Sequence, residues 1–291
     1  MLIRLSYTES MKSALDLAKI ANLLRGDVLK MVYTAGAGHV AGPLSSADLF
    51  AILFFGDMIK FDPQKPQWEE RDRVVLSCGH YCPVLYSALA RSGYFEIGEL
   101  KTFMQLDSRL PGHPERESAP GIEVSSGPLG QGASVAVGMA TALKMKYGHL
   151  SKKEAPRVYC VISDGEIQEG QVWEAFNFAV ARQLDNLIFI LDKNKIQIEN
   201  YTNQLVAGGD IEGRLEAFGL HVIQVDGNQI DKLKEALEKA KQVTQSPVVI
   251  VMDTVAGKGV SFMENKPMWH DKVPTLQQMK SAFEELGVMY D

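Results

Sequence analysis

The sequence predicts a doubly wound α/β fold, in which a mostly parallel sheet carries helices on both faces. Its β-rich runs are continuously apolar and do not alternate, as expected of parallel strands buried on both sides. Helical patterns fall between these runs. The expected strands are residues 73–77, 157–163, 186–192, 221–226 and 247–253, and the helices between them are residues 131–147, 168–182 and 230–242.

The segments before the first strand and after the last complete this layout. Apolar residues at helical spacing predict a helix over residues 10–35, which ends at a Gly-rich loop, and a second helix over residues 46–58. A polar, Pro-bearing connection follows, and residues 254–291 are expected to form a C-terminal tail and helix. No internal repeat or flexible linker divides the chain, so we expect one domain, residues 1–291.

Composition limits the classes of function. Hydrophobic residues make up 46% of the chain, enough for a large core, and no apolar run approaches the roughly 18 residues of a membrane span. The N-terminus lacks the pattern of a secretory signal, so we expect a soluble, cytoplasmic protein with no membrane partner. A net charge of -6 argues against a nucleic-acid partner. The cysteines, Cys78, Cys82 and Cys160, are expected to be reduced packing residues.

Candidate metal ligands follow two of the expected strands. Residues 157–163 lead into Asp164 and Gly165, and residues 186–192 lead to Asn194, thirty positions after Asp164. The carboxyl ends of parallel strands are where ligands bind in open α/β sheets. Asp-Gly alone is also an ordinary turn, but an amide side chain at the end of what should be a neighbouring strand favours a site for a hard cation such as Mg²⁺.

These residues and their surroundings resemble the transketolase family. Asp164-Gly165 followed by Asn194 looks like the thiamine-diphosphate signature, and matching segments occur in the family's order over nearly the whole chain. They are DRVVLSCGH (72–80), LPGHPE (110–115), GPLGQG (127–132), SDGEIQEGQVWEA (163–175), LDNLIFILDKNKIQI (184–198) and GKGVSFMENKPMWH (257–270). The resemblance implies the thiamine-diphosphate-binding fold that anchors the cofactor's diphosphate.

The resemblance implies a ligand set for thiamine diphosphate and its metal, which is Mg²⁺ or else Ca²⁺ or Mn²⁺. The metal ligands would be Asp164, Asn194 and the carbonyl of Ile196, with Gly165 and Asn194 beside the diphosphate. The loop residues Gly127, Pro128 and Leu129 would contact the cofactor's rings, because a Gly-rich loop lets backbone approach a flat ring closely. Lys272 matches a position where some members place a cation near the diphosphate.

Four histidines and two glutamates lie in matching segments. A lone loop histidine is more often a hydrogen-bonding residue than a catalyst, but four in family positions imply a proton-handling pocket. The resemblance assigns His39, His113 and His270 to the sugar and His80 to the cofactor. Glu169 and Glu174 either stabilise a helix N-terminus or, as in the family, lie at a subunit interface and carry protons between cofactors.

The chain departs from the family at three places. Ser163 stands where Gly is usual before Asp-Gly, and Val40-Ala41 replaces Pro-Gly after His39. Ala256 stands where a lysine usually approaches the diphosphate. The first change should leave metal binding intact, whereas the others affect the substrate wall and cofactor affinity.

The family's catalysis also needs a glutamate on the cofactor's aminopyrimidine, which belongs to a second domain, as do the arginines for the sugar phosphate. The chain therefore resembles the N-terminal subunit of a split transketolase, active only with a C-terminal pyrimidine-domain subunit, and we expect a dimer of heterodimers. The expected reaction moves a two-carbon ketol unit from a ketose phosphate to an aldose phosphate, as in the pentose phosphate pathway. Alternatives are a carboligase similar to deoxyxylulose-phosphate synthase or dihydroxyacetone synthase, and a non-catalytic cofactor-binding module.

Overall fold

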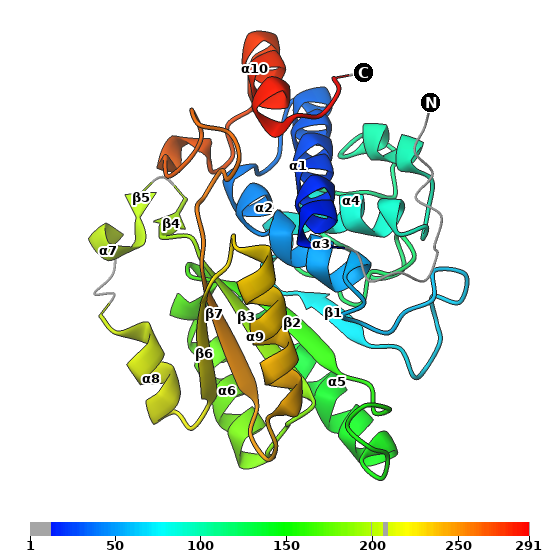
Figure 1. The fold of residues 1–291 in the computed structure, drawn as a ribbon, viewed down its shortest axis with the longest axis vertical. Coiled ribbons are helices and arrows are strands. Elements are labelled where there is room, and N and C mark those ends of the chain that lie inside the picture. Colours follow the sequence, from blue (N-terminus) through cyan, green and yellow to red (C-terminus); the bar gives the residue numbers. More distant parts are fainter. Residues whose placement is uncertain (1–12, 199, 206–208, 291) are drawn as a thin grey trace.

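One fully parallel five-stranded sheet forms the centre of the molecule (Figure 1). The computed structural model describes residues 13–198, 200–205 and 209–290. The strand order is β1-β2-β3-β7-β6. The strands are β1 (Arg73–Leu76), β2 (Val158–Ser163), β3 (Leu187–Lys193), β6 (His221–Asp226) and β7 (Val248–Asp253), and β4 (Ile196–Gln197) pairs separately with β5 (Asn200–Tyr201).

Two hydrophobic cores cover the two faces of the sheet. One contains α9 in front of the sheet in Figure 1, and the other contains α5 and α6 behind it. Within β3, Ile188 and Ile190 enter the first core while Phe189 and Leu191 enter the second. The first core is built with α1 (Ala14–Ala35), α3 (Ala47–Phe55), α4 (Cys82–Arg91), α9 (Ile230–Gln242) and α10 (Leu276–Leu286), and the second with α5 (Gln131–Tyr147), α6 (Gly170–Ala181) and α8 (Ile211–Ala217). The predicted doubly wound α/β fold is confirmed.

Short helices connect these elements. They are α2 (Ala41–Ser45), α7 (Thr202–Leu205) and the 3₁₀ turns Gly79–Tyr81, Ile97–Thr102, Glu166–Gln168 and Pro267–Trp269. Among the described residues, no helix combines the length and apolar character needed to cross a bilayer. All three cysteines are free and buried.

The first helix ends where the sequence predicts. The side chain of Ser13 accepts a hydrogen bond from the Asp16 amide and caps the N-terminus of α1. Residues 10–12 of the expected helix lie outside the described residues. Gly36 takes a left-handed conformation with φ of 68° and ends α1. That turn brings His39 to the carboxyl side of the sheet.

The helix predicted over residues 46–58 is present, but the prediction that it extends to residue 58 is wrong. The helix is α3, which ends at Phe55, and the separate short helix α2 precedes it, with Ser46 between the two. The hydroxyls of Ser45 and Ser46 both donate to the carbonyl of Gly42, at 2.7 and 3.0 Å. Such hydroxyls compete with backbone N–H groups for the same carbonyl oxygens, which gives a local cause for the break between α2 and α3.

The prediction that residues 221–226 are buried on both faces is also wrong. Strand β6 lies at the sheet edge and pairs only with β7, and His221, Gln224 and Asp226 are exposed. Its polar residues at these positions fit an edge strand rather than a central one.

Candidate functional site

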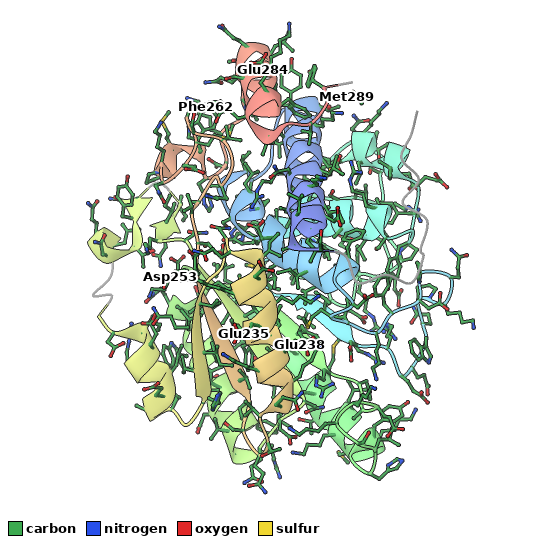
Figure 2. All side chains as sticks on the ribbon, in the orientation of Figure 1. Glu235, Glu238, Asp253, Phe262, Glu284 and Met289 are labelled. Atoms are coloured by element: carbon green, nitrogen blue, oxygen red, sulfur yellow. The ribbon has the colours of Figure 1, made fainter. Side chains whose placement is uncertain are left out.

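The site lies at the carboxyl edge of the sheet, where β2 and β3 end side by side. Ser163 and Asp192 are register partners in these neighbouring strands, and Asp164 and Asn194 follow shortly after them. Asp253, labelled in Figure 2, ends β7 at the same edge. The two side chains expected to bind the metal, Asp164 and Asn194, therefore follow adjacent strands, as predicted.

Asp164 carries an unpartnered buried oxygen. The residue is 6% exposed, and its Oδ2 accepts hydrogen bonds from the Lys195 amide at 2.6 Å and the Thr202 hydroxyl at 3.3 Å. Its Oδ1 is buried and has no hydrogen-bond partner among the described residues. Burial, and secondly the charge of Asp192, raise the pKa of Asp164 to about 7. A bound cation would supply the missing partner and favour the ionised form.

The Asn194 side chain is held in one orientation. Its Nδ2 donates to the Tyr81 hydroxyl at 2.8 Å and to Asp192 at 2.9 Å, and its Oδ1 accepts from the Ile196 amide at 3.0 Å. Lys195, between them, has φ of 69°, an uncommon conformation for a residue with a side chain. This turn is what aims the Lys195 amide at Asp164 while the Asn194 oxygen retains a second lone pair.

Asp192 organises this edge. It is fully buried, and its carboxylate accepts from the hydroxyls of Ser45 at 2.7 Å, Tyr81 at 2.8 Å and Thr254. Tyr81 in turn lies so close to Gly42 that a Cβ at Gly42 would meet its ring at 2.0 Å. The only sequence signal for Asp192 is an acid at the end of an apolar run, and sequence reasoning assigned it no role.

The ligands expected for the metal form a hard oxygen set. They comprise the Asp164 carboxylate, the Asn194 amide oxygen and the carbonyl of Ile196, which begins β4 and is 5% exposed. No three His, Cys, Asp or Glu side chains in the described ranges are arranged as a metal site, and the expected set contains one carboxylate with neutral oxygens. One carboxylate with neutral oxygens suits Mg²⁺, which keeps ligand phosphate oxygens among its partners. The oxygens of Asp164, Asn194 and Ile196 therefore suit Mg²⁺ bound together with a diphosphate.

The loop expected to contact the cofactor precedes α5. Gly127 and Leu129 are half-buried and Pro128 is exposed, and Gly130, with φ of 84°, is the N-cap residue directly before α5. A Cβ on Gly127 would lie 3.6 Å from the His113 ring, so this loop borders the histidines. Gly165, on the other side, would place a Cβ 3.3 Å from Gln197. Both glycines keep backbone accessible at the edge of the site.

Glu166 joins the two halves of the candidate site, and sequence reasoning gave it no role. It is fully buried, and its Oε1 accepts from the Ser77 hydroxyl at 2.5 Å and from the Gly130 amide at 2.7 Å. Its Oε2 has no partner among the described residues, and burial raises its pKa to about 7. The carboxylate thereby ties the turn after Asp164 to the loop before α5. In the sequence, the one indication of a role for Glu166 is its position directly after Asp164-Gly165.

Four histidines from distant segments form one cluster. The ring of His39 lies 5.0 Å from that of His80, 6.1 Å from His113 and 5.1 Å from His270, between ring centroids. His80 also packs edge-on against Tyr81 at 4.7 Å. Since Tyr81 bonds Asn194, the cluster adjoins the expected metal ligands.

The histidines are held neutral near pH 7. Burial and then the neighbouring His270 and His113 lower the pKa of His39 to about 4. Burial is the main cause that lowers the pKa values of His80, His113 and His270. Neutral imidazoles can both donate and accept hydrogen bonds, so the cluster can bind hydroxyl groups and transfer protons.

Other expected site residues lie apart from this cluster. Glu169 and Glu174 are exposed where α6 begins, with Glu169 beside Gly130. Lys272 is exposed and lies over the Trp269 ring at 5.2 Å. Ala256 is fully buried against Ala41 and Ile196, so the position where the family often has a lysine here forms part of a small apolar contact.

Comparison with known proteins gives consistent matches over this chain. Residues 17–289 match the family model described as transketolase, thiamine diphosphate binding domain. The 6-deoxy-6-sulfo-D-fructose transketolase subunit SqwG of Clostridium sp. (strain MSTE9) is 43% identical over 94% of this chain and 96% of its own length. One of the subunits of the apulose-4-phosphate transketolase of Actinobacillus succinogenes is 38% identical over 93% of this chain and 96% of its own.

The fold matches solved transketolases as well. Transketolase from Leishmania mexicana superposes with a TM-score of 0.89 at 32% identity and covers 96% of this chain. The chain spans only 42% of that protein. The extent and identity of these matches show that the chain belongs to the transketolase family and carries its thiamine diphosphate binding domain.

Proposed function

We propose that the chain is the N-terminal subunit of a two-component transketolase, which transfers a two-carbon ketol unit from a ketose phosphate to an aldose phosphate. The observation that carries this proposal is the unpartnered buried oxygen of Asp164 beside the fixed Asn194 side chain, adjoining four neutral histidines. A cation and a diphosphate would complete the first group, and sugar hydroxyls suit the second.

The residues of this chain then divide into two roles. Asp164, Asn194 and Ile196 would hold Mg²⁺ and, with Gly165, the diphosphate of thiamine diphosphate. Gly127, Pro128, Leu129 and His80 would border its rings. When bound, the cofactor supplies the nucleophilic carbon and the electron sink that break the ketose carbon–carbon bond.

The three remaining histidines would handle the sugar. His39, His113 and His270 would bind its hydroxyls and move protons at their ring nitrogens, because their lowered pKa values keep free lone pairs at neutral pH. Exposed Glu169 and Glu174 would lie at an interface with another copy of this chain.

A separate polypeptide would complete the enzyme. The chain spans 42% of a solved transketolase but 96% of each of two relatives that are named as subunits. One relative is named for a sulfonated sugar and the other for a phosphorylated sugar, and both sugars are anionic. We propose that this enzyme also acts on an anionic sugar, and specifically on a sugar phosphate. A pyrimidine-domain partner, assembly as a dimer of heterodimers, a cytoplasmic location and a place in the pentose phosphate pathway complete the proposal.

Replacing Asp164 by Ala tests the proposed metal and cofactor site. In the assembled complex, Asp164→Ala should abolish Mg²⁺-dependent binding of thiamine diphosphate, because it removes a ligand and no core packing. Calorimetry measures the affinity, and circular dichroism checks the fold. Asp226→Ala is the matched control, since Asp226 is an exposed acid that ends β6 at the same sheet edge. Unchanged cofactor affinity in Asp164→Ala would overturn the site assignment.

A further inference from the structure

A second recess lies at the opposite edge of the sheet, where the strands begin. It has a volume of about 660 Å³ and lies beside Asp72, before β1, and Arg157, before β2. Five cationic side chains line it: Lys60, Lys152, Lys153, Arg157 and Lys241. Three carboxylates also line it, so the lining carries a formal excess of two positive charges in a chain of net charge -6.

Arg157 is the buried centre of this cationic group. The residue is 8% exposed, and its Nη2 donates one long hydrogen bond, 3.4 Å, to the carbonyl of Lys241. It forms no ion pair with any residue in the described ranges. A guanidinium has five N–H donors. The N–H groups of Arg157 that do not bond the Lys241 carbonyl can find acceptors in the recess.

Asp72 is a buried carboxylate near Arg157 that forms no ion pair with the guanidinium in the described structure. Asp72 is 6% exposed, and its oxygens accept from the backbone amides of Lys60 at 2.8 Å and Arg157 at 2.7 Å. Burial raises the pKa of Asp72 above its usual value, although the backbone hydrogen bonds and the charges of Lys60 and Arg157 oppose this shift. The Asp72 oxygens are therefore bonded to backbone amides, and the Arg157 guanidinium has no carboxylate hydrogen-bond partner in the described structure.

The carboxylate contacts of the recess lysines are long, at 3.5 Å or more. Lys60 Nζ donates to the carbonyl of Glu154 at 2.5 Å. Lys152 Nζ donates to the carbonyl of Val243 and lies 3.6 Å from Asp185 Oδ2. Lys241 has a loose contact of 3.5 Å with Glu238, a half-exposed acid on α9 that Figure 2 labels. Burial lowers the pKa values of Lys60 and Lys241, and the nearby carboxylates only partly offset this effect.

We propose that this recess is an anion site that binds a small molecule through its phosphate group. Arginine matches phosphate geometry with paired donors, and lysines add charge around it. A volume of about 660 Å³ suits a small metabolite rather than a protein segment. Arg157 and Asp164 flank β2, so the two sites lie about 23 Å apart, at roughly 3.3 Å per residue. The site is thus distinct from the cofactor site and does not depend on the proposed function.

Calorimetry with inorganic pyrophosphate tests the proposal. The full chain carries Asp164→Ala and is measured in EDTA, so that metal-dependent diphosphate binding at the other edge is removed. We expect saturable binding, weakened about tenfold or more by Arg157→Gln, which is the loss of one charge-assisted contact. Lys239→Gln is the matched control, because Lys239 is on α9 but pairs with Glu235 outside the recess, and it should change the affinity less than twofold.

A second variant guards against misfolding, since Arg157 is buried. If Arg157→Gln unfolds the chain, the double variant Lys153→Gln and Lys241→Gln alters only the recess rim and should also weaken binding about tenfold. Absence of pyrophosphate binding at about 10 mM, or equal binding by all variants, would overturn the proposal. Binding of an acidic peptide without pyrophosphate binding would overturn it in favour of a protein partner.

Discussion

The neutral state of His39 makes the stability of this protein depend on pH. The pKa of His39 is about 4 in the folded chain, against 6.5 for an unperturbed histidine. Between these values the unfolded chain binds a proton that the folded chain does not, so stability is lost as pH falls from 6.5 toward 4. At about 1.36 kcal/mol per unit, the loss between pH 7.5 and pH 4.5 is roughly 2.5 kcal/mol.

Replacing His39 by Gln should remove this loss, because the amide does not titrate. Urea denaturation of the apo chain at both pH values gives the free energy of unfolding for each variant. The wild type should lose about 2.5 kcal/mol more than His39→Gln on acidification. His149→Gln removes an exposed histidine outside the cluster and should behave as the wild type. An identical pH dependence in wild type and His39→Gln would refute the assignment of a buried, neutral imidazole.

Two other variants test the remaining site groups in the assembled enzyme. His113→Ala or His270→Ala should raise KM for the sugar or lower kcat by about 10²-fold if the residue transfers a proton, with cofactor affinity nearly unchanged; equal steady-state kinetics with several donor sugars would remove that role. Glu166→Ala should lower the melting temperature and weaken cofactor binding, since the Gly130 amide and Ser77 hydroxyl lose their acceptor at about 1–3 kcal/mol each. Glu166→Gln keeps an acceptor oxygen and should restore both the melting temperature and the cofactor affinity. Thermal denaturation measures the first and calorimetry the second. Equal values for Glu166→Ala and Glu166→Gln would contradict this prediction.

The central strands could be predicted because burial on both faces leaves a simple mark in sequence. Strand β3 is apolar at every position from Leu187 to Leu191, and its side chains divide between two cores. Strand β6 misled the prediction, because Val222, Ile223 and Val225 resemble a buried run although the strand lies at an edge. Edge position is a tertiary property that the strand's own residues express only weakly.

The site was predictable where ligands follow strand ends and unpredictable where the partners are distant in sequence. Asp164 and Asn194 could be placed together from topology alone. The contacts of Glu166 with Ser77, 89 positions away, and of Asp192 with Tyr81, 111 positions away, depend on how the helices pack over the sheet edge. No local pattern encodes such contacts.

The anion site illustrates the same limit. Lys60, Arg157 and Lys241 are scattered over 181 positions, the difference between 241 and 60, and none lies in a basic run. Their convergence arises because strand starts and the end of α9 meet at one edge of a parallel sheet.

Ketol transfer by the isolated chain is the measurement that tests the two-component account most directly. The assay contains the purified chain, Mg²⁺, thiamine diphosphate and donor and acceptor sugar phosphates, and mass spectrometry excludes any copurifying protein. The account predicts no turnover by the chain alone, because it assigns the carboxylate that activates the cofactor to the partner. It predicts activity once the pyrimidine-domain subunit is added. Robust turnover by the chain alone would contradict it.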